Sequence, residues 1–211
     1  MTYNKTINDV HNIDVLAGHE NYNYKEQSLY GSREKLYDPN VPELDNAILN
    51  QNNSSSSVSY ATEGWLFRVQ YDYDGKYFGS ASYRRDASSV FHKDNRWGNF
   101  WSLGAGWLMN KEAILENQEW IDMLKFKISY GLQGNDALLY QNGYRNYTPY
   151  MDQYKLANSN SDFATSLNYK GNKEITWETS HSFNTGFDFT FWGGKLAGSA
   201  EYFSRKTTDM L

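Results

Sequence analysis

The chain has 211 residues, enough for one domain with a core of ordinary size. Its net charge of -5 provides no broad basic field for phosphate backbones, which argues against a nucleic-acid partner. Cysteine is absent, which excludes disulfides and thiolate metal sites, and no run approaches the roughly eighteen apolar residues of a membrane-spanning helix.

Aromatic residues and glycines are abundant. The chain has 18 Tyr, 11 Phe, 7 Trp and 16 Gly but only 3 Pro, a composition typical of strands and turns. Apolar and polar residues alternate along much of the chain, whereas helical periodicity is nearly absent. The sequence predicts about eight strands, beginning with a short one over residues 2–7 and a longer one from Asn12 to about Tyr24.

A polar stretch from Gln27 to Ser57 comes next and ends in "NQNNSSSS". A linker between domains and a long surface loop share this composition. Both interpretations stay open.

Residues 60–89 have the pattern of a β-hairpin. Apolar side chains occupy every second position over residues 65–73, and the return strand continues the pattern. Asp74-Gly75 lies between the two runs and favours the positive φ angles of a tight turn.

Two more strands are predicted over residues 99–110 and 124–134, after a polar loop. Between them, residues 111–124 do not alternate and form the one plausible helical turn. Residues 135–173 are a second long polar stretch, and residues 180–203 form a last hairpin that turns at Gly193-Gly194.

Long and short connections alternate in this map, as in membrane barrels with short periplasmic turns and long outer loops. The predicted fold is therefore an all-β, antiparallel, up-and-down segment of a transmembrane β-barrel. In it, one face meets acyl chains and the other a polar lumen. The residues expected to face lipid are Trp65, Phe67, Val69, Tyr71, Trp101, Leu103, Phe126, Ile128, Tyr130, Phe183, Phe187 and Phe189.

A soluble, aromatic-rich sandwich or glycan-binding module also alternates, but its apolar face packs on a second sheet. The predicted strands reach about ten residues, the length that crosses a bilayer at barrel tilt, whereas ordinary strands have about five or six. A barrel wall is the preferred interpretation.

Three segments carry a family resemblance: "DGKYFGSASYRRDASSVFHKDNRWGNFWSLGAGW", "EWIDMLKFKISYGLQGN" and "ITWETSHSFNTGFDFTFWGGKLAGSAEYFSRKTTDML". In order and spacing they resemble consecutive barrel hairpins of the SusC/RagA-like TonB-linked outer-membrane transporters. The resemblance implies a barrel of about 22 strands with an internal plug, located in the outer membrane of a Gram-negative bacterium. It also implies import of oligosaccharides, or of peptides, with energy delivered through TonB and a SusD-like surface lipoprotein as partner.

Residues 1–211 resemble only a middle portion of that barrel, because no plug, TonB-contacting segment, signal peptide or C-terminal strands are recognisable. Three functions remain: part of a nutrient importer, a soluble glycan-binding module, or a non-transporting outer-membrane barrel used for adhesion. The importer is preferred.

Catalytic motifs are absent: there is no Gly-x-Ser-x-Gly, no phosphate-cradling loop and no set-apart carboxylate pair. The four histidines lack metal-ligand spacing, so we expect no enzyme activity, metal or cofactor.

The charged residues around Arg84-Arg85-Asp86 and Asp94-Asn95-Arg96 are interpreted as stiffening a loop. Aromatic side chains in the second polar stretch suit stacking on sugar rings, and the candidate ligand-binding residues are Tyr140, Tyr144, Tyr147 and Tyr150.

Overall fold

The computed structural model describes residues 1–140, 143–159 and 162–210. The strands in these ranges are β1 (Thr2–Ile7), β2 (His11–Leu36), β3 (Ala47–Tyr73), β4 (Tyr77–Ser88), β5 (Trp97–Leu108), β6 (Ile121–Asn135), β7 (Gln153–Ser159), β8 (Asp162–Tyr169), β9 (Glu178–Phe191) and β10 (Leu196–Thr208). Two short 3-10 helices are η1 (Leu44–Asn46) and η2 (Met109–Lys111). Among these described residues, no helix has both the length and the hydropathy to cross a membrane.

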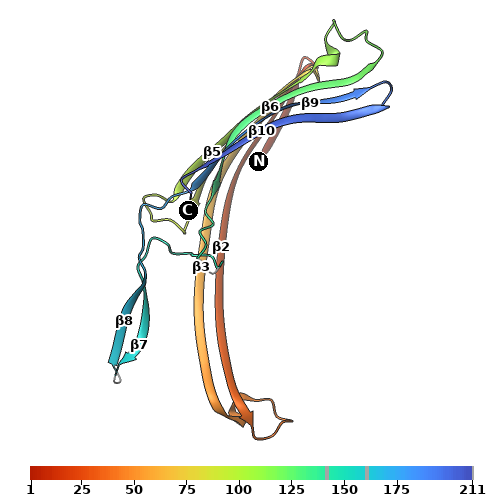
Figure 1. Ribbon diagram of the computed structural model, residues 1–211. Helices are drawn as coiled ribbons and strands as arrows, with labels where there is room; N and C mark the ends of the chain where they lie inside the picture. Colours follow the sequence, from red (N-terminus) through yellow and green to blue (C-terminus); the bar gives the residue numbers. More distant parts are fainter. Residues whose placement is uncertain (141–142, 160–161, 211) are drawn as a thin grey trace. The chain divides into compact units, whose positions relative to one another are not determined.

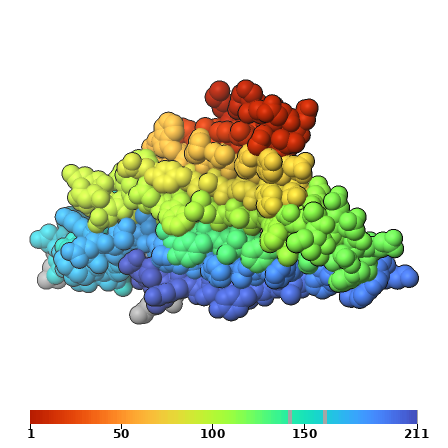
Figure 2. Space-filling view, turned by 90° about the horizontal axis from the view of Figure 1, so that it is seen from above, coloured from red at the N-terminus to blue at the C-terminus, as the bar shows by residue number. Residues whose placement is uncertain are grey.

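Eight strands form one antiparallel sheet in the order β1-β2-β3-β4-β5-β6-β9-β10. Strands β7 and β8 pair in a two-stranded sheet of their own. In Figure 1, β6, β9 and β10 run side by side, and in Figure 2 the chain colours pass from red to blue in the order of the strands. The main sheet therefore confirms the all-β, up-and-down prediction; within it, β1 and β10 form the edges.

The chain divides into two compact units. Unit 1 consists of Met1–Asn21 and Thr62–Leu211, and unit 2 is Tyr22–Ala61. Unit 2 is thus the part of the β2–β3 hairpin that contains η1.

The interpretation of Gln27–Ser57 as a linker or a loop is wrong in detail, because β2 and β3 continue through it as strands joined by η1. The Ser28 and Ser56 hydroxyls are 2.7 Å apart across this hairpin. Asn and Ser rarely favour strands, and they do not alternate with apolar residues here. The two strands of a hairpin satisfy their backbone hydrogen-bonding groups even without an apolar face. A pattern of apolar side chains cannot reveal this backbone pairing.

Positive φ angles occur at both predicted tight turns. Asp74 and Gly75 have φ of 54° and 57°, and Gly193 and Gly194 have φ of 64° and 80°. Glycine enters this region without steric cost, and aspartate tolerates it better than most residues. The two turn predictions are confirmed.

The helical turn predicted over residues 111–124 is limited to a single turn, in which the Glu116 N–H donates to the Glu112 carbonyl at 2.8 Å. The helix η2 ends at Lys111, and β6 begins at Ile121 with a register shift before Met123. Such a bulge breaks the two-residue alternation that identifies a strand. The Asn110 side chain accepts the Leu124 N–H at 3.2 Å, which supplies a partner near the interruption.

Antiparallel pairing places the connections at two ends of the main sheet. The "turn end" holds the short turns 74–76 and 192–195, as predicted, and also residues 109–120. The "loop end" holds residues 89–96 and the long segment 136–177, which contains β7 and β8. The connection 109–120 is longer than the loop 89–96, a departure from strict alternation.

Candidate functional site

All twelve side chains predicted to meet lipid share one face of the main sheet, here called the apolar face. Phe67 lies opposite Tyr83, which lies opposite Trp101. The same registers carry the pattern through β6 to β9. Trp65 and Phe187 expose 54% and 41% of their surface, so no second layer of described residues covers this face.

Aromatic rings border the apolar face at the turn end. Tyr77 stacks between Tyr73 and Trp107, with ring centroids 6.2 and 6.4 Å away. Trp120 lies 5.3 Å from Phe191 by the same measure. We call these five residues the turn-end girdle.

A second aromatic row borders the apolar face toward the loop end. Trp101 and Tyr130 have ring centroids 5.7 Å apart, and Trp65 lies 4.2 Å from the His19 ring. The loop-end girdle comprises Trp65, Tyr83, Trp101, Tyr130 and Tyr202. Smaller apolar residues such as Val69 occupy the band between the girdles, which also includes Lys5 on the edge strand β1.

The opposite, polar face carries paired charges and hydroxyls. The Lys127 ammonium lies 2.9 Å from the Asp188 carboxylate and also pairs with Glu201. The Ser82 and Ser102 hydroxyls are 2.7 Å apart. Unpaired charges are costly away from bulk water, so this network suits a face that borders a polar interior.

A groove of about 540 Å³ lies along the polar side of β1, β2, β3 and their neighbours. Asn12, Asp72 and Lys125 are among its lining residues. The Asn12 amide donates to the Asp72 carboxylate at 3.2 Å. The groove can therefore present both donors and acceptors to whatever occupies the interior.

The loop end has a small core of its own. Val90 and Phe91 are fully buried. The Trp177 ring packs against Phe91 and Phe100, each with a centroid distance of 5.3 Å, and its indole N–H donates to the Arg96 carbonyl at 2.9 Å. These contacts bind the loop 89–96 to the start of β9.

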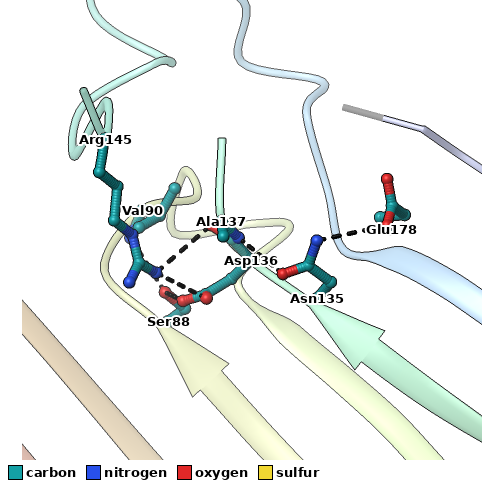
Figure 3. Close-up of polar contacts among 7 residues, drawn as sticks. All are labelled: Ser88, Val90, Asn135, Asp136, Ala137, Arg145 and Glu178. Atoms are coloured by element: carbon teal, nitrogen blue, oxygen red, sulfur yellow. Dashed lines mark hydrogen bonds and ion pairs between the residues drawn. The ribbon is translucent and has the colours of Figure 1, made fainter. Parts of the chain in front are cut away.

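The Asp136 carboxylate joins the end of β4 to the 136–177 segment, as Figure 3 shows. The Ser88 hydroxyl donates to it at 2.6 Å, and the Arg145 guanidinium donates at the same distance. Beside it, the Asn135 amide donates to Glu178 at 3.2 Å. Charge-assisted hydrogen bonds are stronger than neutral ones, so this cluster fixes the loop end near the strand termini.

Two of the four candidate tyrosines lie at the start of the 136–177 segment. Tyr140 donates its hydroxyl proton to the Gln153 amide oxygen at 2.7 Å, and its ring meets Tyr169 edge-on at 6.1 Å. Tyr144 exposes 74% of its surface. Tyr140 thus supports the base of the β7–β8 hairpin, whereas Tyr144 offers a ring to solvent.

The other two candidates are half-buried. The Arg145 guanidinium lies 5.5 Å from the centre of the Tyr147 ring, and Tyr150 meets the His92 ring edge-on at 5.9 Å. The four tyrosines therefore contact different neighbours.

The charged residues near Arg84 act within the protein. The Arg84 guanidinium donates to Asp86 at 2.7 Å and to Glu20 at 3.2 Å, while Arg85 lies 5.0 Å from the Trp97 ring centre. These contacts support the loop-stiffening interpretation. Within the described ranges, no three His, Asp or Glu side chains are grouped to hold a metal ion.

Glu112 forms hydrogen bonds with three neighbouring side chains, a role that the sequence did not indicate. Its carboxylate accepts hydrogen bonds from the Tyr77 hydroxyl, from the Trp107 indole N–H at 2.9 Å and from Lys76 at 3.3 Å. The bonds from Tyr77, then Trp107, hold the pKa of Glu112 below its ordinary value. Glu112 lies in a stretch without alternation, so only the aromatic residues around it could have indicated its role.

Comparison with known proteins agrees with this geometry. A family model described as "TonB dependent receptor-like, beta-barrel" matches residues 2–211. The TonB-dependent receptor SusC of Bacteroides thetaiotaomicron is 32% identical over 168 residues, covering 73% of this chain and 16% of that protein. The TonB-dependent receptor P39 of Formosa agariphila is 29% identical over 219 residues, covering 99% of this chain and 20% of that protein.

A solved structure of the RagAB peptide transporter superposes with a TM-score of 0.89 at 23% identity, covering 100% of this chain and 23% of that one. This likeness shows a shared fold. The chain spans about a fifth of the length of the curated relatives it matches.

Proposed function

The chain belongs to the TonB-dependent receptor-like β-barrel family, and we propose that it is part of the barrel wall of an outer-membrane importer of nutrients. In this proposal the whole protein uses energy delivered by the TonB complex, through segments outside residues 1–211. A SusD-like surface lipoprotein is its partner at the loop end.

The observation that carries this proposal is the division of the main sheet into two faces. The apolar face stays exposed from β3 to β9, and aromatic girdles border it at both ends. From Trp65 to Tyr73 the strand rises about 3.3 Å per residue, which at a barrel tilt of roughly 40° gives a height of about 20 Å. This height approaches the apolar band of about 25 Å in outer-membrane barrels.

The polar face would line the interior of the barrel. The Lys127 ammonium pairs there with the Asp188 and Glu201 carboxylates, so the cluster of three charges keeps one net negative charge and makes the wall polar. The groove beside them adds the polar side chains of Asn12, Asp72 and Lys125 to the surface of the interior. Lipid outside and a polar path inside are the two conditions that an import wall must meet.

Orientation follows from the connections. Outer-membrane barrels have short turns on the periplasmic side and longer loops outside. We therefore assign the turn end to the periplasm and the loop end, including residues 136–177, to the cell surface.

An oligosaccharide is the substrate class we favour. Aromatic rings bind the flat faces of sugars, and Tyr144 presents an exposed ring on a surface loop. A peptide is the second candidate, supported by the fold shared with the RagAB peptide transporter.

The test uses the full-length protein in its native bacterium. Deletion of its gene should abolish growth on one class of oligosaccharide while growth on the corresponding monosaccharide continues, and a plasmid copy should restore it. A protonophore should stop uptake of a labelled substrate, because import depends on TonB.

Growth defects confined to peptides would move the substrate class to peptides. Normal growth on every oligosaccharide and peptide would refute import and favour adhesion. Full-length protein that stays monodisperse without detergent would favour the soluble glycan-binding module instead.

A further inference from the structure

We propose that the apolar face carries a binding site for the phosphate of a glycolipid in the outer leaflet. The site is a pocket of about 370 Å³ near the loop end. The residues that line it are Tyr130, His181, Phe183, Ser204, Lys206 and Thr208. The proposal rests on the proposed function, because it needs this face to meet lipid.

Three neighbouring strands bring the polar groups of this pocket together. Lys206 of β10 lies directly opposite His181 of β9 in the register. On the other side of β9, the Tyr130 hydroxyl is 3.0 Å from His181 Nδ1. An ammonium, an imidazole and a phenol thus gather beside the hydroxyls of Ser204 and Thr208.

Depth places the pocket at the level of lipid headgroups. His181 lies ten residues before Phe191 of the turn-end girdle. At about 3.3 Å per residue and a tilt of roughly 40°, the two differ in height by about 25 Å, the full apolar band. The pocket therefore opens where acyl chains end and charged headgroups begin.

The charge of Lys206 points to an anion. Lys206 is exposed on β10, at the loop end of the apolar face. A lysine on a lipid-facing surface is costly at mid-membrane and favourable beside an anionic headgroup.

The other lining groups suit a phosphorylated glycolipid. A phosphate offers several strong acceptor oxygens to the Lys206 ammonium and the Ser204 hydroxyl, whereas the Thr208 hydroxyl donates to the Thr179 carbonyl at 3.4 Å. Phe183 lines the same pocket on the side toward the apolar band, where it would contact the first carbons of an acyl chain. An ion free in solution would gain nothing from that contact.

The test purifies the full-length transporter from its own outer membrane and measures co-purified phosphorylated glycolipid by native mass spectrometry. Lys206→Gln should lower the retained lipid about fivefold, the factor for one lysine at an anionic membrane surface. His181→Gln should lower it further in the double variant. Lys195→Gln is the matched control, because Lys195 is an exposed lysine at the opposite end of the same hairpin.

A second arm separates the sources of phosphate. Delipidated transporter in phosphatidylcholine nanodiscs should rebind the phosphorylated glycolipid but not its dephosphorylated form, and millimolar inorganic phosphate should not displace it. Retention unchanged by Lys206→Gln, an equal loss with Lys195→Gln, or displacement by inorganic phosphate would overturn the lipid site.

Failure of the proposed function has a different signature. Brominated acyl chains should quench tryptophan fluorescence from the apolar face, with Trp101→Phe reducing the quenched signal. Absence of that quenching would reject the membrane wall itself, whereas normal quenching and uptake with unchanged lipid retention would reject only the phosphate site.

Discussion

Arginine at position 69 tests the membrane wall most directly. Val69 lies four residues from Trp65 and four from Tyr73, midway between the two girdles, and it faces Ala81 across the β3–β4 pair. At about 3.3 Å per residue and a tilt of roughly 40°, each girdle is about 10 Å away in height. Val69→Arg therefore places a charge near the bilayer midplane.

The expected cost is about 2–4 kcal/mol, the range for arginine on the lipid face at the midplane of an outer-membrane barrel. At 1.4 kcal/mol per factor of ten, this lowers the folding equilibrium constant by about thirty- to several-hundredfold. Gln70→Arg is the matched control, because the next residue of the strand is exposed on the polar face. Its cost should stay within about 0.5 kcal/mol.

Urea titration of the full-length protein in phospholipid vesicles, followed by tryptophan fluorescence, measures both variants. The same pair in a soluble sheet would behave differently, since an arginine at a water-exposed position costs little. Equal stabilities for Val69→Arg and Gln70→Arg would refute the assignment of the apolar face to lipid.

Two further predictions concern the loop end. Gly134→Ala should destabilise the protein by about 1–3 kcal/mol, seen as a lower unfolding temperature, because its new Cβ would lie 2.1 Å from the Phe100 ring. Gly79→Ala, where nothing lies within 4 Å, should be neutral, and Phe100→Leu should rescue the first variant. The hydrogen bond from the Lys170 ammonium lowers the pKa of Asp152. The ionised carboxylate therefore stabilises the base of β7–β8 at pH values above its ordinary pKa, and this stabilisation is lost as the pH falls below about 4. Hydrogen-exchange protection of β7 and β8, corrected for intrinsic rates, should fall over that range in the native protein, and the Asp152→Asn variant should show a flat profile.

Local pattern was sufficient for the strands that have one apolar face. In β3 apolar side chains occupy every second position from Trp65 to Tyr73, and Leu66 is the one apolar residue between them. The register with β4 therefore places these side chains on the face that the sequence predicted. The tight turn at Asp74-Gly75 was equally predictable, because few residue pairs tolerate positive φ angles.

Contacts between residues far apart in the sequence could not be predicted. Trp177 donates to the carbonyl of Arg96, 81 residues earlier, and no periodicity links the two positions. The bulge at Ile121 hid the start of β6 for the opposite reason, because it interrupts a periodicity that does exist. The candidate tyrosines were chosen by composition alone, so the sequence could not show that Tyr140 would bond to Gln153.

Apolar side chains are buried at the loop end but exposed on the main sheet. This difference indicates that the two regions have different surroundings. At the loop end, Phe91 is fully buried among neighbouring loops, as in any water-soluble core. On the main sheet, Phe187 keeps 41% of its surface exposed in a band shared with eleven other predicted lipid-facing residues. A sheet designed for water would bury both, since large contiguous apolar patches drive association. Apolar side chains are expected to be buried at the loop end and exposed on the main sheet if the loops are surrounded by water and the strands by lipid.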